Sequence, residues 1–182
     1  MADPLIVSLS LDPTSQDRFD WQRRQHFPPG RTVIGAHVTL FHALPGGEVD
    51  AILADLVDVA CAQKPFDVLV TEVISLGRGA AYRLRSQELA AVHAEMATRW
   101  RGWLTPQDRQ PFRPHVTVQN KADPQMVAAT LAALRAGFVP FSVRGLGLSV
   151  WRYVGGPWSP VVTVPFSAGA PGEVADAVGR GG

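Results

Sequence analysis

Two short segments of this chain carry histidine and threonine in the same order. The tetrad at residues 37–40 reads HVTL, and the tetrad at residues 115–118 reads HVTV. On an extended strand, residues two apart point to the same face, so each tetrad presents an imidazole beside a hydroxyl. The apolar residues between them point to the opposite face, which we expect to be buried. Two such strands facing one another would surround a small anionic group with two imidazoles and two hydroxyls, which favours acid–base chemistry at phosphate.

This set of side chains is suited to the hydrolysis of a phosphodiester, above all a strained cyclic one. One group removes a proton from the attacking water, and another gives a proton to the departing sugar oxygen on the opposite side of phosphorus. Imidazoles can do both because an unperturbed histidine titrates at about 6.5, and each proton transfer contributes about 10²–10⁴-fold. We expect Thr39 and Thr117 to donate hydrogen bonds to the non-bridging oxygens. The likeness of the two tetrads leaves open whether His37 or His115 is the base.

The elements that must position the tetrads follow one order in both halves of the chain. Each tetrad strand leads into a helix, then a Pro-Phe pair (residues 65–66 and 140–141), a long strand, a glycine turn and a returning strand. We infer an α+β fold with two similar lobes related by an approximate two-fold axis, antiparallel sheets lining a central cleft and helices outside. Alternating apolar residues predict strands at the second tetrad and over 5–11, 35–43, 65–76, 80–85, 140–153 and 159–166. Helical periodicity and capping residues predict one helix that starts at 12–15 and ends at about 26, and others over 49–62, 87–103 and 123–136.

Length and composition fit a single bilobal domain over residues 1–166, followed by a flexible glycine-rich tail at 167–182. The net charge of +1 argues against a broad nucleic-acid-coating surface, but it is compatible with a short oligonucleotide or a nucleotide. No apolar run approaches the ~18–20 residues that cross a membrane, and the N-terminus lacks the pattern of a signal peptide. Cys61 is the single cysteine, so no internal disulfide can form, which fits a reducing cytoplasm. We expect a cytoplasmic protein without membrane contact, and a monomer.

The paired tetrads resemble the His-x-Thr/Ser-x signature of the two-histidine (2H) phosphoesterases, also called the 2′-5′ RNA ligase-like family. The resemblance includes the long separation of the tetrads, the two-lobe repeat and Arg113-Pro114 directly before the second tetrad, and it covers residues 5–166. It implies a bilobal antiparallel fold and metal-independent action, without a cofactor, on 2′,3′-cyclic phosphates or 2′-5′ linkages. The catalytic residues that it implies are His37, Thr39, His115 and Thr117.

Further side chains near the tetrads are candidates for binding the substrate. Counting by twos places Phe41 and Gln119 one step further along the catalytic face, where Phe41 would stack on a base and Gln119 would bond phosphate or base. Packing at the cleft edge is the alternative for both. Arg113 would hold a phosphate bidentately, or it would pair with an acid such as Asp108.

The long strand at 140–153 supplies two more candidates, Trp151 and Tyr153, which share a strand face. They would close one end of the cleft and stack on a base, or they would only cover the sheet. Three other residues are assigned no part in the site: His42, which counting by twos places on the opposite face, His93 on a helix, and Arg23, which we expect to be solvated.

We therefore predict an enzyme that opens the 2′,3′-cyclic phosphate of an RNA end, a nucleotide or a short oligonucleotide. One alternative is 2′-5′ RNA ligation, or cleavage of a 2′-5′ oligonucleotide or a cyclic dinucleotide. Another is a non-catalytic module that binds RNA or nucleotides. A metallohydrolase is a third, but two histidines without an Asp, Glu or Cys beside them make a poor metal site, so we predict no metal.

Overall fold

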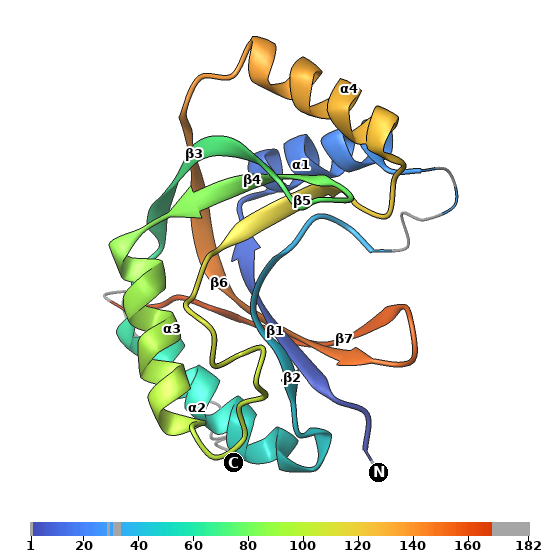
Figure 1. Cartoon of the computed structure of the whole chain (residues 1–182). Coiled ribbons are helices and arrows are strands. Elements are labelled where there is room, and N and C mark those ends of the chain that lie inside the picture. The colour runs from blue at the N-terminus through green and yellow to red at the C-terminus, as the bar shows by residue number, and fades with distance from the viewer. Residues whose placement is uncertain (1, 29, 31–33, 169–182) are drawn as a thin grey trace, which may run out of the picture.

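The computed structural model describes residues 2–28, 30 and 34–168 of the chain. The order of helices and strands agrees with the order expected from sequence, and the predicted α+β class is confirmed. The first tetrad strand begins at Val38 rather than at residue 35, and the third helix ends at Arg99. The elements, shown in Figure 1, are β1 (Leu5–Leu11), α1 (Pro13–His26), β2 (Val38–Leu44), the 3-10 turn η1 (Gly46–Glu48), α2 (Val49–Ala62), β3 (Phe66–Ser75), β4 (Ala80–Arg85), α3 (Gln87–Arg99), β5 (His115–Gln119), α4 (Pro124–Ala136), β6 (Phe141–Tyr153) and β7 (Trp158–Pro165).

Three of the helices begin at a side chain that caps the first turn. Asp12 accepts a hydrogen bond from the Ser15 amide at α1, and Asp123 does the same for the Met126 amide at α4. Ser86 caps α3 in the same way. Because these side chains satisfy amide groups that have no partner within the helix, the sequence marks where the helices start.

The described strands form one antiparallel sheet in the order β2-β1-β6-β3-β4-β5, and β7 pairs with β6 beyond this path. The two tetrad strands, β2 and β5, therefore occupy the two ends of the path. The sheet is curled, so that these ends approach one another and Cα atoms of β2 and β5 come within 8 Å. Closure of the sheet thus brings together two segments that are far apart in sequence.

The strand pairing crosses between the two halves of the sequence repeat. The second tetrad strand β5 pairs with β4, the returning strand of the first half, whereas the first tetrad strand β2 pairs with β1. The long strand β6 continues past β3, so that its first residues pair with β3 and its later residues pair with β1 and β7. At Gly147 a Cβ atom would collide with the carbonyl oxygen of Val164, so the close approach of β7 requires glycine there.

The helices lie outside the curled sheet (Figure 1). Helix α1 packs on β5, α4 packs on β3 and β4, and α2 packs on β6 and β7. The buried apolar side chains of the described residues form a core cluster with members from both halves, among them Phe19, Phe41 and Trp100. This core holds the tetrad strands from behind and leaves their other face to the cleft.

The division into one domain and a tail stays a prediction, and residues 169–182 lie outside the described residues. The first two residues of the expected tail are hydrogen-bonded, because the amides of Ser167 and Ala168 donate to the carbonyls of Ala60 and Gln63 at the end of α2. Among the described helices, none combines the length and apolar character of a membrane span.

Candidate active site

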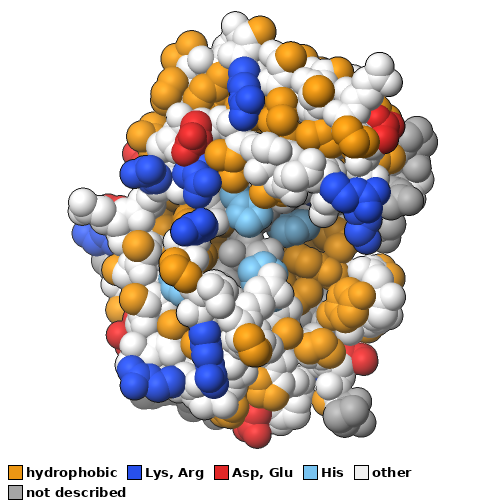
Figure 2. All heavy atoms as spheres, in the orientation of Figure 1, with side chains coloured by type: hydrophobic (Ala, Val, Ile, Leu, Met, Phe, Trp, Pro, Cys, Tyr) orange, Lys and Arg blue, Asp and Glu red, His pale blue; other side chains and the backbone are white. Residues whose placement is uncertain are grey.

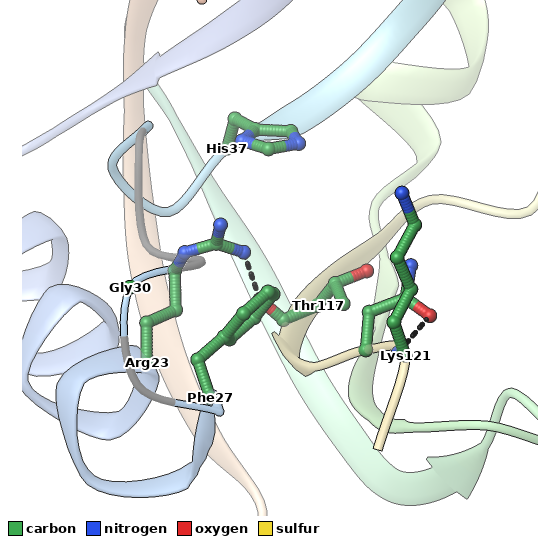
Figure 3. Close-up of a pocket in the computed structure, with 7 residues that line it drawn as sticks. Arg23, Phe27, Gly30, His37, Thr117 and Lys121 are labelled. Carbon is green, nitrogen blue, oxygen red and sulfur yellow. Dashed lines mark hydrogen bonds between the residues drawn. The ribbon is translucent and has the colours of Figure 1, made fainter. Parts of the chain in front are cut away.

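The tetrads present their histidines and threonines on one face, as the alternation predicts. Their intervening apolar residues are fully buried, whereas the histidines and threonines are half-buried. His37 and Thr117 line one cavity of about 410 Å³ (Figure 3), and Thr39 and His115 line another of about 210 Å³. Each cavity thus combines the histidine of one tetrad with the threonine of the other. Figure 2 shows histidine side chains gathered around a hollow, with Lys and Arg side chains near its rim.

The two tetrad histidines are anchored by the same local hydrogen bond. Nδ1 of His37 lies 2.9 Å from the carbonyl oxygen of Gly35, and Nδ1 of His115 lies 2.9 Å from that of Arg113. A carbonyl oxygen only accepts, so Nδ1 carries the proton in both rings. The other nitrogen, Nε2, is therefore the atom of each ring that can accept a proton when the ring is neutral and donate one when it is charged.

A β-bulge follows the threonine in both tetrads. Thr39 pairs with Ser8 but Phe41 pairs with Val7, which leaves Leu40 as an extra residue in β2. Likewise Thr117 pairs with Ala81 but Gln119 pairs with Ala80, which leaves Val118 as an extra residue in β5. A bulge of one residue reverses the alternation of faces beyond it.

The bulges correct the prediction that Phe41 and Gln119 face the substrate. Phe41 is fully buried, with its ring stacked on that of His93 at 4.7 Å and edge-on to that of Trp100 at 5.0 Å. Gln119 is 1% exposed and donates a hydrogen bond to the Thr130 hydroxyl. Both side chains therefore belong to the core, and neither contacts the cleft.

The residues after them turn to the cleft instead, which corrects the assignment of His42 to the opposite face. His42 lines the cavity of Thr39 and His115, and Asn120 lies at the equivalent place in the cavity of His37 and Thr117. His93, which the sequence did not assign to the site, lines the same cavity and is stacked between the rings of Phe41 and Phe112.

His42 is held by Asp108, whose side chain is fully buried. Nδ1 of His42 lies 2.9 Å from a carboxylate oxygen of Asp108, which also accepts from the His42 and Ala43 amides and the Thr105 hydroxyl. Burial raises the pKa of Asp108, but these hydrogen bonds outweigh burial and hold that pKa below its ordinary value. Asp108 is thus a charged anchor for a third imidazole, rather than the partner of Arg113.

Arg23 is a site residue that the sequence interpretation missed. It is 5% exposed, its Nη1 donates to the Thr117 carbonyl at 2.7 Å, and its guanidinium packs on the Phe27 ring. Its guanidinium points toward the space between His37 and Thr117 (Figure 3), and burial lowers the pKa of Arg23 to about 10. The available signal was its position four residues after Phe19, which places both on one helix face.

The surroundings of the two tetrad histidines differ. The His37 ring packs against that of Trp158, with centroids 4.5 Å apart, and faces the charge of Arg23. The pKa of His37 is lowered to about 4, chiefly by burial and also by the charges of Arg23 and His115, while the hydrogen bond to Gly35 raises it in part. His37 is therefore neutral at pH 7, with Nε2 free to accept a proton.

The remaining predicted binding residues lie at different distances from the tetrads. Trp151 lines a cavity of about 260 Å³ together with His37 and Trp158, and its Nε1 donates to the Ser8 hydroxyl. Arg113 is exposed and lines the cavity of His115. Tyr153 is 40% exposed at the end of β6 and lines none of these cavities, so the structure does not bring it to the site. Among the described residues, no three His, Cys, Asp or Glu side chains are grouped as metal ligands.

Comparison with known proteins relates most of the chain to one family. The sequence profile of the 2′-5′ RNA ligase superfamily matches residues 11–157. The fold is similar to that of TT0787 of Thermus thermophilus, at 15% identity and a TM-score of 0.67 over 91% of this chain and 99% of that one. It is also similar to E. coli LigT complexed with 3′-AMP, at 15% identity and a TM-score of 0.63 over 92% of this chain and 99% of that one. A structure described as a phosphoesterase is similar at 16% identity and a TM-score of 0.63, again over 92% of this chain and 99% of that one. No curated protein sequence matches.

Proposed function

Because this chain belongs to the 2′-5′ RNA ligase superfamily, we propose that it is a metal-independent phosphodiesterase that opens 2′,3′-cyclic phosphates of RNA ends or nucleotides. The observation that carries this proposal is the matched pair of tetrads. Each holds its imidazole by Nδ1 to a carbonyl two residues earlier, and each shares a cavity with the threonine of the other. Such an arrangement presents an Nε2 atom and a hydroxyl from each side of one small anionic group.

In the proposed reaction, His37 is the base and His115 is the acid. Nε2 of His37 accepts a proton from water while the water oxygen forms its bond to phosphorus. One of the two ring P–O bonds breaks on the opposite side, and Nε2 of His115 gives its proton to the departing sugar oxygen. The product is a phosphate monoester, and exchange of protons with solvent restores both rings. The assignment follows the lowered pKa of His37, which leaves it neutral at pH 7.

Thr39 and Thr117 complete the proposed site by donating hydrogen bonds to the two non-bridging oxygens, where charge accumulates in the transition state. We propose that the imidazole of His42, which Asp108 orients, and the guanidinium of Arg113 contact the phosphate from the His115 side, because both residues line the cavity of His115. Trp151 borders the His37 side, where a base could stack. LigT, which has the same fold, is described in complex with 3′-AMP, and a nucleotide carrying phosphate is the ligand that we propose here.

Replacement of each tetrad histidine tests the proposal directly. His37→Ala and His115→Ala should each lower kcat for adenosine 2′,3′-cyclic phosphate by about 10²–10⁴-fold, because each removes one proton-transfer group. His26→Ala is the matched control, since His26 lies at the end of α1 and its ring bonds Gln22, and it should retain wild-type turnover. Thermal unfolding of each variant shows that the fold is kept, and EDTA should leave turnover unchanged.

Full activity in either tetrad variant would rule out the assignment. The same assay with a 2′-5′-linked dinucleotide and a cyclic dinucleotide separates the related reactions of this family from the proposed one. A wild-type protein that binds these nucleotides and turns over none of them would instead be a binding module.

A further inference from the structure

A groove of about 660 Å³ borders the His115 side of the cleft. It is formed by β3, β4, the start of α3 and residues 112–114, and it shares Phe112 and Arg113 with the cavity that contains His115 and His42. The proposed function does not use this groove. Because the groove meets the cleft at Phe112 and Arg113, a substrate longer than one nucleotide would reach it.

Three arginines face this groove from neighbouring strands and the loop before β5. Arg83 pairs directly opposite His115 across the β4–β5 ladder, so the two side chains share a sheet face. Arg85 lies two residues further along β4 on that same face, opposite Leu69 of β3. Arg113 lies two residues before His115 and borders both cavities. A line of cations therefore leads away from the proposed acid.

The positive charge of two of these arginines is not balanced by a neighbouring carboxylate among the described residues. Arg83 pairs with Glu72 at 2.9 Å. For Arg85 and Arg113, no carboxylate of the described residues lies within 4.0 Å, and no acidic side chain is among the residues that line the groove. The carboxylate of Glu88, in the first turn of α3, accepts from the Ser86 hydroxyl. In a protein whose net charge is only +1, this local excess of positive charge is a feature of the groove.

We propose that this groove binds the phosphodiester backbone of a single-stranded RNA whose terminal phosphate lies between the tetrads. The proposal rests on the proposed function for the placement of that terminal phosphate. Arginine suits phosphate because its planar fork matches two phosphate oxygens. The backbone of Arg83 lies about one strand spacing from that of His115. The preferred substrate is then an RNA end rather than a free mononucleotide.

Binding of unreactive RNA tests the groove without requiring turnover. The probes are a mononucleotide and a tetranucleotide RNA, each ending in a 3′-phosphate, with affinities measured by calorimetry over a range of salt concentrations. Wild-type protein should bind the tetranucleotide at least about tenfold more tightly, as expected for one or two additional charge-assisted hydrogen bonds. Its affinity should also fall more steeply with salt, because more phosphates are neutralised.

Arg85→Gln separates the groove from the tetrads. It should abolish most of the tetranucleotide advantage and reduce the salt slope by about 0.7, the value for one phosphate contact on a single strand, while leaving mononucleotide affinity within twofold. The matched control is Arg101→Gln, an exposed arginine beyond the other end of α3 that should change neither affinity.

Equal affinity of the wild type for the two probes would overturn the proposal that the groove binds RNA. The same holds if the Arg85→Gln variant keeps the full difference in affinity between the tetranucleotide and the mononucleotide. Turnover of adenosine 2′,3′-cyclic phosphate is measured separately. If the wild type does not turn over adenosine 2′,3′-cyclic phosphate, the proposed function is refuted. The dependence of affinity on RNA length would still decide whether the groove binds RNA.

Discussion

At the scale of single residues, the two tetrad histidines are distinguished by the side chains around them and not by the tetrads themselves. Both histidines obtain the same Nδ1 anchor because an extended backbone places a carbonyl two residues earlier within reach. The difference between the rings comes from residues elsewhere in the sequence: Trp158 of β7 against His37, and Arg23 of α1 between the tetrads. The sequence pattern thus predicted the pair of rings, whereas the proposed assignment of base and acid rests on surroundings that the pattern does not contain.

The lowered pKa of His37 predicts the acid side of the pH–rate profile. A base acts only when neutral, and a pKa of about 4 means that His37 stays neutral until the pH falls to about that value. We expect kcat/KM for adenosine 2′,3′-cyclic phosphate to be maintained well below pH 6.5 and to fall by half near pH 4. Circular dichroism at each pH shows whether the fold persists. A midpoint near the ordinary histidine value of 6.5 would assign the base to a different group, or would show that the ring is more solvated than its packing against Trp158 indicates.

At the scale of elements, the bulges decide which side chains face the cleft. Sequence reasoning that counts by twos along the first tetrad reaches Phe41, and along the second it reaches Gln119, yet both are in the core. A bulge arises from pairing with another strand, here Ser8 and Val7 of β1 or Ala80 and Ala81 of β4. That pairing is not visible in the tetrad itself. The apolar character of Phe41 was the one available indication of the true face.

Removal of the Phe41 ring tests this correction. Phe41→Ala should lower the free energy of unfolding by about 3–5 kcal/mol, because it leaves a cavity between β2, Trp100 and His93. At a temperature where the variant is folded, its affinity for 3′-AMP should stay near that of wild type, since the ring does not line the cleft. The measurements are denaturant unfolding and calorimetric titration.

Tyr153→Ala is the control for an aromatic side chain on a strand but outside the core. Tyr153 is 40% exposed, so its removal should cost less than about 1 kcal/mol. If Phe41→Ala were as mild as Tyr153→Ala and weakened nucleotide binding instead, the ring would face the substrate after all.

At the scale of the whole molecule, the sequence predicted the order of elements and the repeat, but not how the halves are joined. The Pro-Phe pairs and glycine turns mark local starts and stops, which neighbouring residues determine. The pairing of β4 with β5, and of β6 with β1, β3 and β7, depends on contacts between segments that are distant in sequence. As a result, the second tetrad strand is held by the first half of the chain, and one strand is common to both sides of the cleft.

This interlocking leads us to propose that residues 1–166 unfold as one unit. Tryptophan fluorescence and far-UV circular dichroism should give a single, coincident denaturant transition, as expected for a two-state domain. A variant on the shared strand makes the test stronger. Gly147→Ala places a methyl group against the Val164 carbonyl, and such overpacking typically costs about 1–3 kcal/mol.

If the halves are one cooperative unit, Gly147→Ala should move the fluorescence and circular dichroism midpoints down together by the same amount. Gly156→Ala is the control, because no atom lies within 4 Å of the Cβ that it would add, and it should leave both midpoints in place. Two separate transitions, with only one of them shifted by Gly147→Ala, would show that the lobes unfold independently. The position of each tetrad would then depend on its own lobe, and damage to β6 would leave part of the cleft intact. A common shift would instead mean that β6 couples the strands that carry His37 and His115 into one cooperative unit.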